Sequence, residues 1–137
     1  KRTVHTITVK PAEDIVLVKM DARLMVQVIV NIVDNAVKYT QKGAHIFIST
    51  RLENKKAIVE IADDGPGISD VDKPHVFDMF YTTGAKAADS RRGLGLGLAL
   101  CKSIIEAHHG AISVENNKPQ GALFRITLPA EEVTLHE

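Results

Sequence analysis

The sequence predicts an α+β fold, a two-layer α/β sandwich in which a mixed, mainly antiparallel sheet of about five strands packs on about three helices. Three observations predict it. Strand-like and helix-like segments are mixed along the chain. Neighbouring strand-like segments are joined by short polar turns, as in hairpins. The longest helical segment is amphipathic, so it needs a sheet or another helix to cover its apolar side.

Each predicted element has its own signature. Short runs rich in β-branched residues predict strands, and apolar residues at helical spacing, with capping residues, predict helices. The predicted strands are residues 3–9, 15–19, 45–52, 57–62, 111–115 and 123–128. The predicted helices are residues 21–39, 72–80 and 95–109, with Asp21 as the cap of the first and Gly110 as the stop of the last.

Length and composition indicate a single domain over residues 1–137, with its core in residues 3–129. Basic and acidic residues balance at 17 each, which predicts neither a nucleic-acid interface nor direct contact with a membrane. Cys101 is the only cysteine, so an internal disulfide is excluded. Because the chain starts with Lys1 and enters a strand almost at once, we expect it to be a piece of a longer protein.

The first predicted helix carries a polar stripe. Asn31, Asn35 and Lys38 share one side of it, since residues at i, i+4 and i+7 align along a helix. Two amide oxygens and one positive charge suit a hard cation such as Mg²⁺ together with phosphate. A solvated polar side of an amphipathic helix is the ordinary explanation of such a stripe, and the stripe alone favours that explanation.

Two glycine-containing segments follow. Residues 63–67, Asp-Asp-Gly-Pro-Gly, come directly after a predicted strand and taken alone would indicate only a turn. Residues 93–98, Gly-Leu-Gly-Leu-Gly-Leu, precede a helix, where free amides and the helix dipole favour phosphate. Their spacing is neither the dinucleotide-binding fingerprint nor a Walker A loop. Packing of the leucines is the alternative explanation.

Taken together and in this order, these segments resemble a known family. Residues 31–39, 63–68, 77–80 and 93–98 are similar to the N, G1, F and G2 boxes of the ATP-binding domain of sensor histidine kinases. That family belongs to the wider group of ATPases with the Bergerat fold. The resemblance covers about residues 21–128, and details of the F box and the last strand also resemble potassium-responsive kinases of the Kdp type.

The resemblance implies ATP and Mg²⁺ as ligands and gives each box a role. Asp63 would accept the exocyclic amine of adenine, Asn35 and Asn31 would serve Mg²⁺, and Phe77 and Phe80 would anchor in the core an ATP lid over residues 81–92. The implied nucleotide-binding residues are Asn31, Asn35, Lys38, Tyr39, Asp63, Gly65, Gly67, Ile68, Phe77, Phe80, Gly93, Leu94, Gly95, Leu96, Gly97 and Leu98. The implied catalytic residues are Asn31, Lys38, Lys86, Arg91 and Arg92, of which the lid cations would offset charge on the γ-phosphate.

Two absences refine the expected function. Hydrolytic relatives carry a Glu where this chain has Asn31, so the sequence favours a kinase over an ATPase. None of the six histidines lies in the helical, acid-followed context of a phosphoacceptor. We therefore expect transfer to a histidine on a separate dimerisation domain, then to a response regulator. We also expect the domain to lie in the cytoplasm, in a parent kinase anchored in the membrane.

Three alternatives stay open on the sequence. One is a Bergerat-fold ATPase that drives conformational change, against which Asn31 counts. Another is a serine kinase of the anti-sigma type, which has related boxes. The last is a degenerate module that binds without chemistry, which the intact boxes disfavour.

Overall fold

The structure, a computed structural model, describes residues 6–13, 16–39, 44–81 and 97–131. Its strands are β1 (Thr6–Lys10), β2 (His45–Glu53), β3 (Lys56–Asp63), β4 (Ala111–Asn116) and β5 (Ala122–Pro129). Its helices are α1 (Ala22–Tyr39), α2 (Gly97–Ala107) and one short 3-10 turn, η1 (Lys73–His75).

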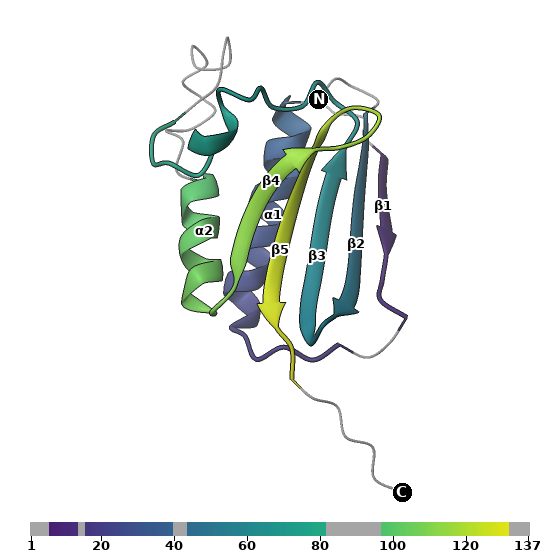
Figure 1. Cartoon of the computed structure of the whole chain (residues 1–137), viewed down its shortest axis with the longest axis vertical. Helices are drawn as coiled ribbons and strands as arrows, with labels where there is room; N and C mark the ends of the chain where they lie inside the picture. The colour runs from purple at the N-terminus through teal and green to yellow at the C-terminus, as the bar shows by residue number, and fades with distance from the viewer. Residues whose placement is uncertain (1–5, 14–15, 40–43, 82–96, 132–137) are drawn as a thin grey trace, which may run out of the picture.

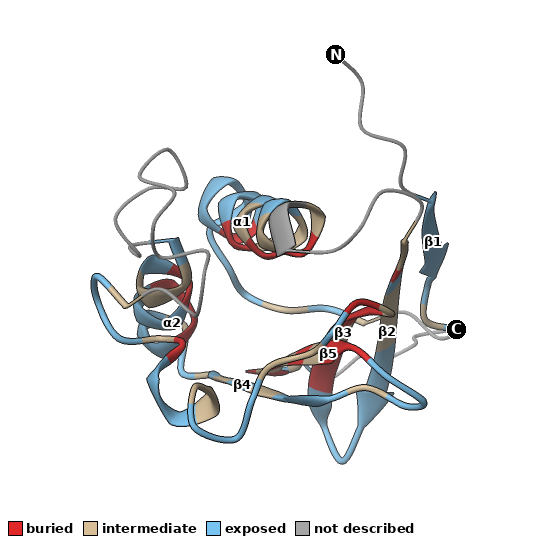
Figure 2. Ribbon diagram, turned by 90° about the horizontal axis from the view of Figure 1, so that it is seen from above, coloured by how far each residue is buried: buried red, intermediate tan, exposed pale blue. Residues whose placement is uncertain are grey.

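The five strands form one mixed sheet in the order β1-β2-β3-β5-β4. β1 and β2 run parallel, and the other three pairs are antiparallel. Two of these antiparallel pairs, β2 with β3 and β4 with β5, are hairpins of consecutive strands, and β3 with β5 is not. Figure 1 shows α1 behind this sheet and α2 to the left of β4, and Figure 2 shows that both helices lie on the same side of the sheet. The predicted two-layer sandwich with a mixed, mainly antiparallel sheet is therefore confirmed.

The core lies between the helices and the sheet. The side chains that are almost completely buried come from both layers: Ile32, Ile46, Ile61, Ile105, Ile126, Val28 and Cys101. Alternation along β5 explains its share, because every second residue of that strand is buried. The apolar side of α1 supplies Val28 and Ile32, as predicted from its helical spacing, and α2, β2 and β3 supply the others.

The helix ends show how the layers are held together. Asp21 caps α1 as predicted, since its Oδ1 accepts hydrogen bonds from the backbone of Arg23 at 3.0 Å and Leu24 at 3.3 Å. The Asp21 amide donates to His108 Nε2 at 3.0 Å, while His108 Nδ1 lies 2.8 Å from the Ile104 carbonyl. The start of α1 is thus bonded to the end of α2.

Two predicted elements are corrected. The predicted helix over residues 72–80 is only the turn η1. Pro74 has no amide to donate, and the backbone hydrogen bonds from His75 to Asp72 and from Asp78 to His75, both 2.9 Å, span three residues instead of the four of an α-helix. The predicted strand over residues 15–19 contributes only an isolated bridge between Leu17 and Glu131 in the described part of the chain. The described residues therefore contain two α-helices, not about three.

Gly110 closes the end of α2, because its amide donates to the Ile105 carbonyl at 2.9 Å. The left-handed residue at this end is His109, with φ 65°. Gly110 is also needed for a close approach, because a Cβ there would lie 2.3 Å from the Thr127 carbonyl oxygen of β5.

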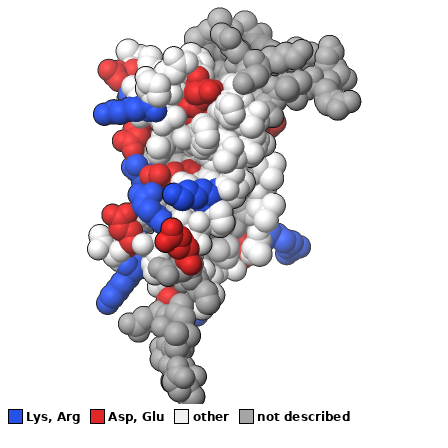
Figure 3. Space-filling model, turned by 90° about the vertical axis from the view of Figure 1, so that its right-hand side faces the viewer, with Lys and Arg blue, Asp and Glu red and all other residues white. Residues whose placement is uncertain are grey.

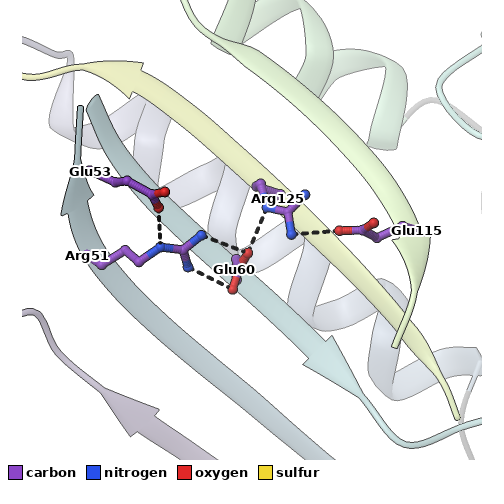
Figure 4. Close-up of polar contacts among 5 residues, drawn as sticks. All are labelled: Arg51, Glu53, Glu60, Glu115 and Arg125. Carbon is purple, nitrogen blue, oxygen red and sulfur yellow. Dashed lines mark hydrogen bonds and ion pairs between the residues drawn. The ribbon is translucent and has the colours of Figure 1, made fainter. Parts of the chain in front are cut away.

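The outer side of the sheet, away from the helices, carries charged side chains that form ion pairs with one another. Glu60 on β3 lies between Arg51 on β2 and Arg125 on β5, and Figure 4 shows the chain of contacts that Glu53 and Glu115 extend at either end. Figure 3 shows the flank that carries β1, where acidic and basic residues lie intermixed. Among the described residues, no helix is long and apolar enough to cross a membrane.

Candidate nucleotide site

The predicted site segments that the structure describes meet at one end of the molecule. Figure 1 shows at its top the end of α1, the end of β3, the loop that follows β3 and the first turn of α2. The parts of the N, G1 and F boxes that are described, and the end of the G2 box, therefore lie together although up to 67 positions of sequence separate Asn31 from Leu98. The turn between β4 and β5 lies at the same end.

Asp63 is the buried polar centre of this end. It is the last residue of β3 and only 6% exposed. Its Oδ1 accepts two backbone hydrogen bonds, from Gly65 at 2.9 Å and from Ala122 at 3.2 Å. No described residue bonds to Oδ2. One carboxylate oxygen is therefore held by the protein, and the other has no partner in the part of the chain that the structure describes.

The environment of Asp63 disfavours its charge. Burial raises the pKa of this carboxyl group, and the nearby Asp64 adds to that effect, whereas the two amide donors act in the opposite direction. The net pKa lies above the ordinary aspartate value. A buried acceptor of this kind is stabilised by a ligand that brings a hydrogen-bond donor.

The loop after Asp63 is tightly placed. Asp64 ties the loop to β2, because its Oδ1 accepts the His45 amide at 2.8 Å. Gly67 has φ 81°, a conformation that favours glycine, and a Cβ there would lie 3.0 Å from the Gly121 carbonyl oxygen. Ile68 is partly buried and packs against the core. The loop is thus fixed at both ends.

The asparagines of α1 lie on the side of the helix that faces α2. Asn31 and Asn35 are both half-buried, and Asn31 lies close to Cys101 of α2, whose thiol donates to the Val28 carbonyl at 3.6 Å. Burial raises the pKa of the Cys101 thiol to about 11, against a smaller opposite effect of the Asn31 side chain, so this cysteine is a neutral core residue. The side chains of Lys38 and Tyr39 lie outside the described residues, although α1 includes both positions.

The two F-box phenylalanines differ. Phe77 is partly buried and packs edge-on against Phe124, with ring centroids 6.1 Å apart, as expected of an anchor. Phe80 is not in the core, contrary to prediction: its side chain is 62% exposed, and its φ of 67° is uncommon for a non-glycine residue. Val76, 7% exposed, takes the second core position of this segment.

Most of the predicted lid and of the G2 box falls on positions that the structure leaves out. Those predictions concern Lys86, Arg91, Arg92, Gly93, Leu94, Gly95 and Leu96. Of the box, Gly97 and Leu98 are described and form the first turn of α2. Leu98 packs against the core, and a Cβ on Gly97 would meet nothing within 4 Å.

The sequence did not predict that residues at the start of β5 help to hold the Asp63 side chain. Ala122 supplies one of the two amides on Asp63, and Gly121 supplies the close approach that makes this possible. The glycine at 121, between a polar turn and a strand, was the available signal. Among the described residues, no group of three or more His, Cys, Asp or Glu side chains could hold a metal ion.

Comparison with known proteins assigns the family. Residues 20–132 match the profile of the histidine kinase-, DNA gyrase B- and HSP90-like ATPases. The chain belongs to this family. It is 48% identical over 127 residues to the sensor protein KdpD of Clostridium acetobutylicum, covering 93% of this chain and 14% of that protein. It is 40% identical over 118 residues to the adaptive-response sensory kinase SasA of Rippkaea orientalis, covering 85% of this chain and 30% of that protein.

Solved structures agree with these relatives. The mycobacterial sensor histidine kinase MprB superposes with a TM-score of 0.82 at 28% identity, covering 94% of this chain and 86% of that one. The catalytic domain of histidine kinase ThkA superposes with a TM-score of 0.77 at 31% identity, covering 91% and 78%. The Bergerat fold, the assignment as a catalytic domain of the sensor histidine kinase type and the likeness to Kdp-type kinases are thereby confirmed. The chain spans only 14% and 30% of the two curated relatives.

Proposed function

We propose that this domain binds ATP with Mg²⁺ and donates the γ-phosphoryl group to a histidine on a separate dimerisation and phosphoacceptor domain. A response regulator would then receive the phosphoryl group. The family supports nucleotide binding, and the named relatives support the kinase role. One relative of known structure, ThkA, is described in complex with its response regulator TrrA, which supports a partner of that class here. Placement in the cytoplasm, within a membrane-anchored kinase, stays part of this proposal.

The observation that carries the proposal is Oδ2 of the Asp63 carboxylate, which has no bonding partner among the described residues. Because backbone amides occupy Oδ1, the carboxylate is oriented before any ligand arrives. The exocyclic amine of adenine is a donor that fits Oδ2. Guanine has a carbonyl oxygen at that ring position, and two acceptors facing each other in a buried site are repulsive. The geometry thus favours ATP over GTP.

The asparagine side of α1 fits Mg²⁺ and phosphate. Mg²⁺ takes few protein oxygens and several from water and phosphate, so one amide oxygen, that of Asn35, suffices. Bound there, Mg²⁺ would neutralise charge on the phosphate oxygens during transfer. Asn31 would assist the metal or a bound water, and as an amide it has no basicity with which to activate water for hydrolysis. Lys38, Lys86, Arg91 and Arg92 are the proposed cations for phosphate.

The remaining predicted residues complete the proposed nucleotide site. Tyr39 would pack near the nucleotide, and Gly65, Gly67 and Ile68 would let the backbone approach the base closely. The glycines and leucines from Gly93 to Leu98 would offer backbone amides to the phosphates at the start of α2.

The first test is calorimetric titration of the purified chain with ATP and GTP, with and without Mg²⁺. We expect ATP to bind and GTP to bind at least about tenfold more weakly. Asp63→Asn should lower ATP affinity by about 10- to 100-fold, because it removes a charged acceptor of the adenine amine. Asp70→Asn is the matched control, since that side chain is 95% exposed and bonds only to Lys73. No ATP binding by the unmodified chain at millimolar concentration would refute the proposal.

The second test concerns the acceptor. The chain alone should neither label itself with the γ-phosphate of ATP nor hydrolyse ATP at an appreciable rate. Adding a purified histidine-bearing helical hairpin of a kinase of this type should give acid-labile phosphate on the hairpin. Acid-stable phosphate on a partner protein would indicate a serine kinase instead, and hydrolysis without a partner would indicate an ATPase.

A further inference from the structure

The turn between β4 and β5 lies against the loop that carries Asp63. Asn117 Nδ2 donates to the Asp63 carbonyl oxygen at 2.9 Å, and Gln120 Nε2 donates to the Asp64 carbonyl oxygen at 2.7 Å. The Asn117 amide also donates to the Gly121 carbonyl at 2.8 Å, which closes the turn on itself. Two side chains from one turn therefore satisfy two successive carbonyl groups of the candidate adenine loop.

The neighbouring residue holds the other end of the same loop. In the orientation that satisfies both of its groups, the Asn116 amide donates to the Ile68 carbonyl at 3.3 Å and accepts from Lys73 Nζ at 3.1 Å. Asn116 is the last residue of β4, and Asn117 is the first residue of the turn that follows. Together they bond to Ile68 and Asp63, which lie at the two ends of the loop over residues 63–68.

Gly121 explains why the two segments can approach so closely. A Cβ at this position would lie 1.8 Å from the Asp63 carbonyl oxygen, and its φ is 112°, which favours glycine. The approach brings the amide of Ala122 within 3.2 Å of Asp63 Oδ1. The orientation of the Asp63 carboxylate is thus set jointly by its own loop, through Gly65, and by this distant turn.

We infer that Asn117, supported by Asn116 and Gln120, is a positioning residue for base recognition by Asp63. The inference rests on the proposed role of Asp63 as acceptor of the adenine amine. Asn117 acts through the backbone of Asp63. By binding the carbonyl of Asp63 it fixes the backbone from which the carboxylate projects, so it limits the directions that Oδ2 can take.

A purely structural role for Asn117 makes a different prediction. If the side chain only stabilised the turn, its loss would weaken binding of every nucleoside triphosphate to the same degree. If it acts through Asp63, its loss would weaken only ligands that use the carboxylate. ATP and purine riboside triphosphate separate these cases, because the second ligand lacks the exocyclic amine and is otherwise the same.

The experiment measures the affinity of the chain for both ligands by calorimetry. In the unmodified chain, ATP should bind about tenfold or more tightly than purine riboside triphosphate. In Asn117→Ala this ratio should fall about fivefold, with the affinity for purine riboside triphosphate nearly unchanged. Asn117→Asp, which keeps the shape but replaces the donor by an acceptor, should lower the ratio at least as much. Ser113→Ala, an exposed change on β4, should leave the ratio unchanged.

Thermal melts identify any variant that fails to fold. If Asn117→Ala does not fold, Gln120→Ala serves as a milder second variant, and it should lower the ratio of the two affinities by a smaller factor. In an Asp63→Asn background, Asn117→Ala should produce no further change in the ratio. Equal weakening of both ligands, or an unchanged ratio, would overturn the inference while leaving the role of Asp63 intact. An unmodified chain that binds both ligands equally would overturn the role of Asp63, and the inference with it.

Discussion

Glu60 is the residue whose charge holds the outer side of the sheet together, and Glu60→Gln tests that directly. Its side chain is 16% exposed and lies 3.0 Å from Arg51 and 2.7 Å from Arg125, on the strands to either side. Each contact is a charge-assisted hydrogen bond in a partly buried setting. We assign each a contribution of about 1 kcal/mol to the free energy of unfolding, a value that lies between those of exposed and of buried pairs. Glutamine keeps the shape but leaves two guanidinium groups without an anion between them.

We expect Glu60→Gln to lower the free energy of unfolding by about 2 kcal/mol, which corresponds to a fall in Tm of about 7 °C for a domain of this size. Urea unfolding and thermal melts followed by circular dichroism would measure both quantities. Glu115→Gln is the matched control, because that carboxylate is 51% exposed and pairs only with Arg125. The control should cost less than about 1 kcal/mol.

The pH dependence of the free energy of unfolding gives an independent test of whether the charge of Glu60 stabilises the fold. Burial alone would raise the pKa of Glu60, but the hydrogen bonds from Arg51 and Arg125 outweigh it and hold the pKa below its ordinary value of 4.5. A group whose pKa is lower in the folded state stabilises the fold above its unfolded pKa, and this contribution is lost as the pH falls through the folded value. The difference between the unmodified chain and Glu60→Gln should therefore be full at pH 7 and shrink below about pH 4.5. A difference independent of pH, or no larger than that of Glu115→Gln, would refute this account of the network.

Three further results are expected. Gly110→Ala should cost roughly 3 kcal/mol in a urea titration, because its Cβ would meet a backbone oxygen at 2.3 Å, whereas Gly97→Ala, with open space around its Cβ, should be neutral or slightly stabilising; equal effects would contradict the close approach. The Cys101 thiol, fully buried and with a pKa of about 11, should react with a thiol reagent only as fast as the domain unfolds; fast labelling under native conditions would contradict its burial. ATP affinity should fall as the pH is lowered through the raised pKa of Asp63, at a higher pH than an ordinary aspartate would give, and this fall should be absent in Asp63→Asn; an identical profile for both would contradict the role of this carboxylate.

The sequence predicted the elements whose signals are local. The amphipathic pattern and the Asp21 cap of α1 predicted that helix within a residue, and alternation predicted β5 and its buried side. What failed depends on contacts that no local pattern shows. The segment around Pro74 has apolar residues at plausible helical spacing, but only Val76 and Phe77 reach the core, which is too little burial to hold a helix.

The candidate site was predicted in the same partial way. Asp63 and Gly67 stand in a recognisable order, so their importance could be inferred before their geometry was known. The partners that orient Asp63 come from 54 to 59 positions further along the chain, in Asn117 and Ala122. Residues so far apart meet only because β5 pairs with β3, and that pairing is a property of the sheet order. The exposure of Phe80 was also beyond local reasoning, since an aromatic residue with positive φ contradicts ordinary backbone preference.

The two hairpin turns of the sheet have opposite consequences for anyone who engineers this domain. The turn between β2 and β3 is a short exposed one in which Asn54 and Lys55 have φ of 53° and 65°, and its side chains hold no part of the site. A tag, a fluorophore or a sensor domain inserted there would join two strand ends at the far end of the sheet. The turn between β4 and β5 is equally exposed at Lys118 and Pro119, yet its length is fixed by Gly121 against Asp63. Surface exposure alone therefore does not separate the turn that can accept an insertion from the turn that orients Asp63.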